Sequence, residues 1–284
     1  MLRFHRREIL TAGLLAGSAA FFPSRSLFAE DAAEAAAQDA KKKSLQVLLE
    51  QAKQIAVKVG TTPEPVACEL KEAPLIHYSD QVRNLPESSL WIWEHEGLPA
   101  LFCKIERIAK SDGATKAWQY CCVPGTSDKV DVTWGRNFRW RSRDVSIQWT
   151  PLASAQPPRD QTRARLTQMK SMAREFSGHT EQTPTNSRQE MRLLASPLHQ
   201  YAAPDRNVVD GAVFGLTSNG TNPDALLLVE ALKGGEADSK WRFAAVGMTG
   251  DGVEIMYQQK KVWSKPYTDG PGDYRSWVWY VAAP

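Results

Sequence analysis

The sequence lacks the short motifs that mark the commonest classes of enzyme. It contains no P-loop, no glycine fingerprint of a dinucleotide-binding turn, no serine-centred elbow and no haem attachment motif. Its five histidines are widely spaced, and no His-Glu-x-x-His motif places two of them on one helix face. The sequence therefore predicts no catalytic constellation, no metal site and no cofactor.

An excess of charge of one sign is also missing once the N-terminus is set aside. The 284 residues include 35 basic and 32 acidic side chains. The first 29 residues hold four arginines and one glutamate, so the rest of the chain carries 31 of each sign. A surface that binds nucleic acid needs a basic excess, so we expect no nucleic-acid partner.

Cysteine is scarce, and its spacing is not that of a metal or redox motif. The four cysteines are Cys68, Cys103, Cys121 and Cys122, with no C-x-x-C pair. Adjacent cysteines rarely bridge each other because the geometry is strained. Cysteine packs as a small hydrophobe, so we expect structural thiols. In an oxidising compartment Cys68 or Cys103 could instead form a disulfide with the adjacent pair.

No apolar run reaches the ~20 residues that a comfortable membrane-spanning helix needs. Residues 1–29 instead resemble a secretory signal, with a basic start, an apolar middle (Ile9–Phe22) and the small residue Ala29 at a plausible cleavage point. Arg6 and Arg7, followed closely by apolar residues, resemble a twin-arginine signal. A general secretion signal that carries two arginines is the alternative. The mature chain is expected to be periplasmic or extracellular, without a membrane span.

The remaining chain divides into five segments by composition. Residues 30–43 have low complexity and are expected to form a flexible spacer. Residues 44–150 and 160–264 each begin with a helical apolar pattern and continue as alternating strands. Residues 151–159 form a proline-rich linker, and residues 265–284 form a tail that ends in a strand.

The two long segments match each other when the chain is compared with itself at a shift of 123 residues. Such self-similarity at one long period indicates repeated structural units. We therefore predict an α+β fold with an internal duplication, each copy being one helix followed by an antiparallel meander of about five short strands. The matching pairs include Leu70/Leu193, Pro74/Pro197, Tyr78/Tyr201, Trp118/Trp241 and Trp140/Trp263.

Two carboxylates are the candidates for acid–base chemistry. One extra residue in the second copy aligns Glu106 with Glu230, and each ends an apolar strand. If the copies pack about a two-fold axis, the two could converge and act as a carboxylate pair. The alternative is that each meets solvent or a local arginine at its strand end.

Two short polar stretches are interpreted as turns. Glu94–Glu96 looks like a metal or acid–base cluster, but it falls in a predicted hairpin turn, where a solvated role is favoured. Arg83 and Asn84 align with Arg206 and Asn207 before the first hairpin strand of each copy. They could hold an anion, but a turn in which asparagine tolerates an unusual backbone is favoured.

Tryptophan is abundant, and two tryptophans in the tail are candidates for binding. Trp277 and Trp279 fall on one face of the last predicted strand and have no counterparts at the shift of 123. An exposed aromatic pair can stack on sugar rings, which would suit an exported protein. The alternative is that they close the core beneath the last strand.

Five segments of the core carry a resemblance to a known family: RLTQMKSMAREF (Arg165–Phe176), MRLLASPLHQY (Met191–Tyr201), DGAVFGL (Asp210–Leu216), PDALLLVEA (Pro223–Ala231) and KWRFAAVGM (Lys240–Met248). With these segments the core resembles an uncharacterised family of exported proteins from planctomycete bacteria, which carry leaders of the twin-arginine type. The resemblance implies export and lineage, and it brings no activity or site residue with it.

These observations favour a non-catalytic binding or interaction protein of the cell envelope. The expected partner is a glycan, bound through Trp277 and Trp279, or an envelope protein. The alternative is a hydrolase that acts on an envelope or polysaccharide substrate through Glu106 and Glu230, paired between the two copies.

Overall fold

The structure is a computed structural model in which the chain forms two units, Met1–Lys43 and Ser44–Pro284. The predicted twin-arginine stretch lies outside the described residues. Within the described part of the chain, no helix is both long and apolar enough to cross a membrane. The structure describes residues 25–61, 64–109, 116–135, 138–182, 187–234 and 240–282.

Helix α1 (Arg25–Lys53) includes the stretch expected to be a flexible spacer. Residues 30–43 are helical, although the side chains of residues 34–43 are all exposed. Alanine, glutamate and lysine are strong helix formers, so local propensity accounts for a helix that no packing supports. Further along, Leu48 and Ala52 are fully buried, and they anchor the last turns of α1 in the second unit.

The first half of the second unit (residues 44–150) continues from α1 as antiparallel strands. Four of them, β4 to β7, form a long meander in which each strand pairs with the next, while β8 lies between β1 and β9. The strands are β1 (Ile55–Val59), β2 (Val66–Ala67), β3 (Glu69–Leu70), β4 (Ile76–Asp80), β5 (Leu85–His95), β6 (Leu98–Ala109), β7 (Lys116–Pro124), β8 (Val130–Trp134), β9 (Phe138–Arg141) and β10 (Thr150–Pro151).

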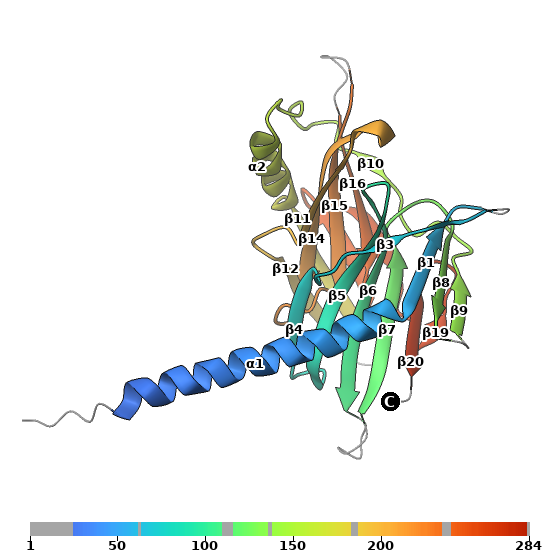
Figure 1. The fold of residues 1–284 in the computed structure, drawn as a ribbon. Helices are drawn as coiled ribbons and strands as arrows, with labels where there is room; N and C mark the ends of the chain where they lie inside the picture. The colour runs from blue at the N-terminus through green and yellow to red at the C-terminus, as the bar shows by residue number, and fades with distance from the viewer. Residues whose placement is uncertain are drawn as a thin grey trace, which may run out of the picture. The chain divides into compact units, whose positions relative to one another are not determined.

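The second half (residues 160–264) begins with helix α2 (Thr162–Ala173), which packs on β14 and β15 (Figure 1). Its sheet has the order β10-β16-β15-β14-β12-β11-β17-β18, with β13 paired to β14. The remaining elements are β11 (Phe176–Gln182), β12 (Ser187–Leu193), β13 (His199–Ala203), the 3₁₀ turn η1 (Pro204–Arg206), β14 (Val208–Thr217), β15 (Ala225–Leu232), β16 (Trp241–Gly247), β17 (Gly252–Tyr257), β18 (Lys260–Lys265), β19 (Gly272–Asp273) and β20 (Val278–Ala282).

The described chain is mostly antiparallel sheet with two helices, which confirms the predicted antiparallel strands. Each half has more strands than the predicted five, with nine from β1 to β9 and eight from β11 to β18. Two-residue strands such as β2 and β3 are too short to produce a readable alternation of apolar and polar residues.

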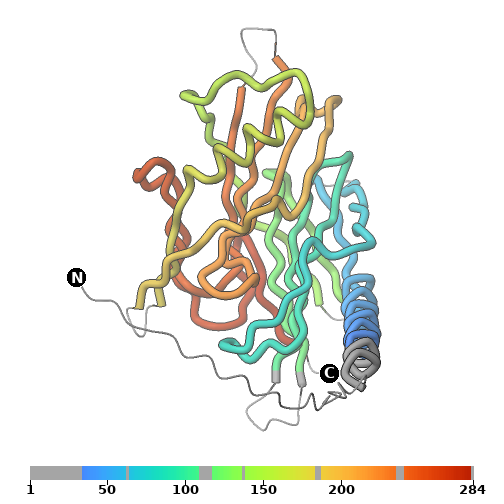
Figure 2. Tube along the Cα trace, turned by 90° about the vertical axis from the view of Figure 1, so that its left-hand side faces the viewer, coloured from blue at the N-terminus to red at the C-terminus, as the bar shows by residue number. Residues whose placement is uncertain are grey.

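Three apolar clusters form the core of the second unit. One lies beneath α1 in the first half and one beneath α2 in the second. The third contains Ile92 and Phe102 from the first half together with Val213 and Leu226 from the second. The strands of the two halves therefore face each other, as their neighbouring paths in Figure 2 show. Burial on both faces explains why β15 is almost continuously apolar in sequence and why β5 contains the apolar stretch Leu90–Trp93.

The halves also exchange their last strands. In the tail, β20 pairs with β7 of the first half, with Trp279 opposite Cys121. In the segment that follows the first half, β10 pairs with β16 of the second half, with Thr150 opposite Phe243. The two crossing segments meet where the Ser146 hydroxyl donates to the Ser276 carbonyl. Each sheet is thus completed by residues that come from the other half of the chain.

Candidate functional site

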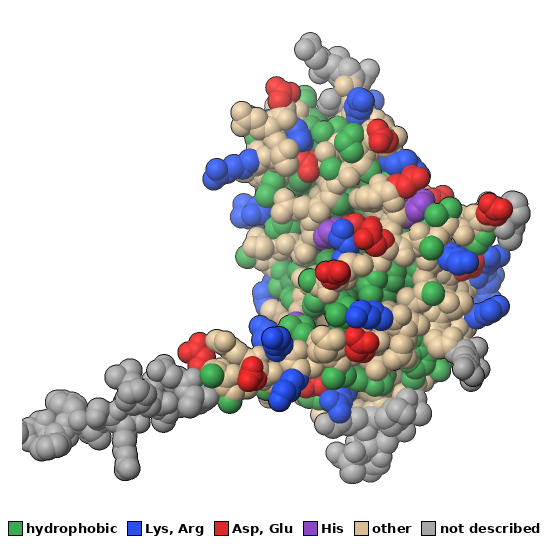
Figure 3. Space-filling view, in the orientation of Figure 1, with side chains coloured by type: hydrophobic (Ala, Val, Ile, Leu, Met, Phe, Trp, Pro, Cys, Tyr) green, Lys and Arg blue, Asp and Glu red, His purple; other side chains and the backbone are tan. Residues whose placement is uncertain are grey.

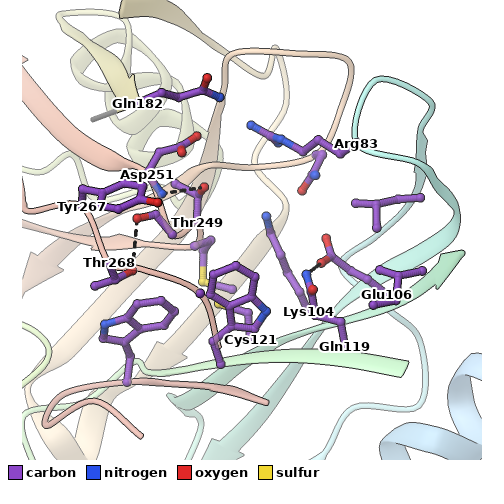
Figure 4. A pocket seen from close by; sticks show the side chains of 18 residues that line it. Arg83, Lys104, Glu106, Gln119, Cys121, Gln182, Thr249, Asp251, Tyr267 and Thr268 are labelled. Atoms are coloured by element: carbon purple, nitrogen blue, oxygen red, sulfur yellow. Dashed lines mark hydrogen bonds between the residues drawn. The ribbon is translucent and has the colours of Figure 1, made fainter. Parts of the chain in front are cut away.

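A cavity of about 320 Å³ lies between the two halves of the second unit (Figure 4). This volume is at the lower end of the range that small-molecule sites occupy. We call it the Lys104 cavity and define it by six of its lining residues: Arg83, Lys104, Glu106, Asp251, Trp277 and Trp279.

Lys104 is a charged side chain of this cavity whose amine has no partner among the described residues. It lies on β6, only 3% of it is exposed, and its side chain extends into the cavity (Figure 4). Among the described residues, no atom accepts a hydrogen bond or forms an ion pair with its amine. Burial lowers the pKa of Lys104, while the charges of Glu106 and Asp224 act in the opposite direction.

Glu106 points to the same face of β6 as Lys104 because side chains two residues apart on a strand share a face. It is buried, and both of its oxygens accept hydrogen bonds. The Tyr78 hydroxyl donates to Oε1 at 2.7 Å, and the Gln119 amide donates to Oε2 at 2.7 Å. Burial and the Glu106 charge raise the pKa of Tyr78, so this hydroxyl remains a donor.

Arg83 contributes the second positive charge of the cavity wall, and it is already paired. Its guanidinium lies 2.8 Å from Asp224 of the second half and 3.4 Å from Asp80. The following residue, Asn84, has φ 56°, and Asn207 in the other half has φ 65°. Both asparagines therefore adopt the left-handed backbone that the predicted turn requires.

Asp251 and Lys265 flank the other side of the cavity. Burial raises the pKa of Asp251, and a hydrogen bond from Gln182 acts against this shift. The Lys265 amine donates to the Asp251 carbonyl at 3.2 Å and lies 4.7 Å from the ring of Trp277. Burial lowers the pKa of Lys265 to about 8.

Trp277 and Trp279 lie together in the wall of the Lys104 cavity, whereas the sequence suggested an exposed aromatic patch. Trp277 is only 6% exposed and stacks on Tyr274 at 4.6 Å, and Trp279 is half-buried. The indole Nε1 of Trp279 is buried and has no hydrogen-bond partner among the described residues. The large apolar residues exposed in the described chain are Val47, Val66, Val82 and Val145.

A second, smaller cavity of about 190 Å³ contains Glu230, and we call it the counterpart cavity. Glu230 accepts a hydrogen bond from the Tyr201 hydroxyl at 2.8 Å and pairs with Arg242 at 2.6 Å. Burial raises the pKa of Glu230. Arg242 also lies 4.2 Å from the ring of Trp149. Glu106 and Glu230 therefore line different cavities, and this geometry does not support a mechanism that needs both carboxylates in one site.

The strand positions around Glu106 and Glu230 carry different residues. Lys104 lies opposite Leu90 and Cys121, while Leu228 lies opposite Val213 and Ala244. Gln119 donates a hydrogen bond to Glu106, whereas Arg242 donates one to Glu230. A comparison of positions 104 and 228 would have singled out Lys104 from the sequence, because a lysine there replaces an apolar residue.

The predicted solvated turn at Glu94–Glu96 instead packs against the second half. Glu94 is buried, and it pairs with Lys71 at 3.0 Å and with His199 at 2.5 Å. The hydrogen bonds from these partners lower the pKa of Glu94, although burial acts against them. Glu96 forms an ion pair with Arg206. The turn thus carries charged contacts between the halves, which no local pattern could reveal.

The four cysteines are free thiols, three of them fully buried. Cys103 and Cys122 lie directly opposite each other on β6 and β7, with their sulfur atoms 2.7 Å apart. Cys121 points to the other face and lines the Lys104 cavity. Burial raises the pKa of Cys121 to about 12, so its thiol is protonated and unreactive at neutral pH.

Acidic and basic side chains are interspersed on the face drawn in Figure 3. Within the described ranges, no group of three or more His, Cys, Asp or Glu side chains could hold a metal ion. Comparison with models of protein families, with curated proteins and with solved structures found no match to this chain.

Proposed function

We propose that this chain is a non-catalytic binding protein that takes a small polar molecule into the Lys104 cavity. One observation carries the proposal: only 3% of Lys104 is exposed, and its amine reaches the cavity and has no partner among the described residues. A charge that loses most of its hydration without gaining a partner is unfavourable. A ligand that offers an acceptor oxygen would supply the missing partner.

The other charged groups of the cavity support binding over catalysis. Both oxygens of Glu106 accept hydrogen bonds, and Arg83 is paired with Asp80 and Asp224. A general acid or base must exchange a proton with the substrate, so it needs an unoccupied face toward it. Glu106 and Arg83 are thus held by partners within the protein, whereas the Lys104 amine has none among the described residues, and an ammonium group serves well as a fixed hydrogen-bond donor.

Export is part of the proposal. The basic and apolar pattern of residues 1–29 and the resemblance to exported planctomycete proteins support a periplasmic or extracellular location. Cell fractionation of the wild-type chain and of a variant carrying Arg6→Lys and Arg7→Lys tests this. Export of the wild-type chain alone is expected, and equal export of both forms would exclude the twin-arginine route.

We also propose that the two halves arose by internal duplication. The order of pairing β4-β5-β6-β7 recurs as β13-β14-β15-β16, and a tyrosine on β4 or β13 donates to the buried glutamate in each. Ser146 and Trp149 share their spacing with Ser276 and Trp279, so the exchanged strands belong to the repeat. Under this proposal the Lys104 cavity and the counterpart cavity descend from one ancestral cavity. Lys104 then distinguishes the cavity that binds a ligand from the one that does not.

A thermal-shift screen tests the proposed function. The full chain is scanned against sugars, polyols, amino acids and small organic acids. Ligands that stabilise the wild-type protein are expected to lose their effect with Lys104→Leu and to keep it with Lys260→Leu, which removes an exposed ammonium elsewhere. If no compound stabilises the wild-type chain, or if Lys104→Leu responds like the wild type, the proposal fails.

A further inference from the structure

We infer that the Lys104 cavity recognises an uncharged hexose ring, whose hydroxyl oxygens accept from Lys104 and whose C–H face lies on Trp279. The inference rests on the proposed function and adds the chemical class of the ligand. It is drawn from the charges that surround the Lys104 amine, the hydrogen-bonding groups of the wall and the aromatic side chains.

The charges of the wall disfavour a charged ligand. Two cations, Arg83 and Lys104, and two anions, Glu106 and Asp251, line the cavity, so its lining is balanced. Asp224 stands behind Arg83 as a further carboxylate. Glu106 and Asp224 act on the Lys104 charge in one direction and Arg83 in the other, so the amine already lies among charges of both signs. This balance favours a neutral oxygen as the missing acceptor.

A zwitterion such as an amino acid fits poorly for a related reason. Its ammonium group would have to share Glu106 with the donors Tyr78 and Gln119, or Asp251 with the donor Gln182. A hydroxyl group can pair with either a donor or an acceptor of the wall, because it both donates and accepts hydrogen bonds. Several hydroxyls on one ring match a wall that presents an ammonium, amides and occupied carboxylates together.

The aromatic residues of the cavity provide the apolar surface that a sugar ring uses. Trp277, Trp279 and Tyr267 all line the cavity, and Trp277 is held rigid by its stack on Tyr274. The axial C–H groups of a pyranose carry partial positive charge, and the face of an indole ring is negative. A cavity of about 320 Å³ suits one ring and excludes a long stacked chain.

Isothermal titration of the full chain at pH 7 tests the inference with four probes: free glucose, methyl β-glucoside, methyl β-N-acetylglucosaminide and methyl β-glucuronide. At least one neutral probe is expected to bind with one site and at least tenfold more tightly than the glucuronide. Lys104→Leu is expected to weaken that neutral probe at least tenfold, and Lys260→Leu is expected to leave it unchanged. Preference for a methyl glycoside over free glucose would identify a glycan end as the source of the ring.

Two other outcomes overturn the inference in distinguishable ways. The neutral-ring inference is refuted if the glucuronide binds more tightly than the neutral probes. It is also refuted if only amino acids or organic acids from the thermal-shift screen bind, and if their binding is lost in Lys104→Leu. Either result leaves the proposed function standing. Absence of any ligand in both experiments refutes the inference and the proposed function together.

Discussion

Lys104 of β6 and Leu228 of β15 occupy the same register position in their two sheets. Each lies two residues before a buried glutamate that accepts a hydrogen bond from a tyrosine on a short strand, β4 or β13, one strand further across the sheet. Leu228 is fully buried in apolar surroundings, whereas Lys104 brings an unpaired amine to a cavity. Leu228 therefore serves as an internal control for Lys104, because it occupies the same register position with a role in packing alone.

Replacing Lys104 by leucine is expected to stabilise the protein. The substitution copies the residue of the other half and removes a buried charge that has no partner among the described residues. We expect the free energy of unfolding to rise by about 1 kcal/mol or more, measured by urea denaturation. Lys260→Leu, at an exposed position, should change it by less than about 0.5 kcal/mol. A loss of 2 kcal/mol or more with Lys104→Leu would mean that the lysine holds the wall together.

Replacing Gln119 by arginine is expected to close the Lys104 cavity. In the counterpart cavity Arg242 pairs with Glu230 and stacks on Trp149. An arginine at position 119 can reach Glu106 and Trp279 in the same way. We expect a ligand of the Lys104 cavity to bind at least ~10-fold more weakly, a loss of ~1.4 kcal/mol or more.

The melting temperature of this variant should stay close to that of the wild type. Gln148→Arg, which adds the same charge at an exposed residue outside the Lys104 cavity, provides the control. Unchanged ligand affinity in a folded Gln119→Arg variant would show that the ligand does not occupy the Lys104 cavity.

The titration of Lys265 gives the stability a defined pH dependence. Its pKa is lowered to about 8 in the folded chain and is ordinarily 10.5. Burial disfavours the charged form of Lys265. The resulting loss of unfolding free energy is therefore fully present below pH 8 and disappears as the pH rises toward 10.5. The unfolding free energy of the wild type should therefore rise between these values relative to Lys265→Met. Parallel pH curves for the two proteins, from urea titrations, would contradict this.

An oxidising environment is expected to join Cys103 and Cys122. The two thiols lie opposite each other with sulfur atoms 2.7 Å apart, while Cys121 points to the other face. Oxidised glutathione would accept the two electrons, and the chain would lose two hydrogens. Peptide mapping under non-reducing conditions should find the Cys103–Cys122 link, and Cys103→Ala should abolish it. A link from Cys68 to either thiol of the adjacent pair would refute the assignment.

The sequence was most informative where a property is local. Alternating apolar residues predicted the antiparallel strands, and the asparagines at 84 and 207 predicted turns with left-handed backbone, as their φ values show. Comparison of the chain with itself aligned Tyr78 with Tyr201 and Glu106 with Glu230. It could not show that each tyrosine binds a glutamate, because the partners are 28 and 29 residues apart on separate strands.

The sequence was least informative where burial depends on the other half of the chain. A lysine in a strand normally faces solvent, and Lys104 is buried only because the second half covers its face of β6. The sequence left Trp277 and Trp279 with two interpretations, an exposed aromatic pair or core beneath the last strand. In the structure β20 pairs with β7, and both tryptophans line a cavity. The helix over residues 30–43 was overlooked for the opposite reason, since low complexity concealed its strong local propensity.

The measurement that tests the account most directly is the affinity of the tightest-binding neutral methyl glycoside for the wild-type chain and for Lys104→Leu. Both are titrated at pH 7, with unfolding curves recorded on the same samples. The account predicts a single site in the wild type and at least tenfold weaker binding by a variant that is equally or more stable. Equal affinities in two folded proteins would contradict it, because Lys104 would then have no part in binding.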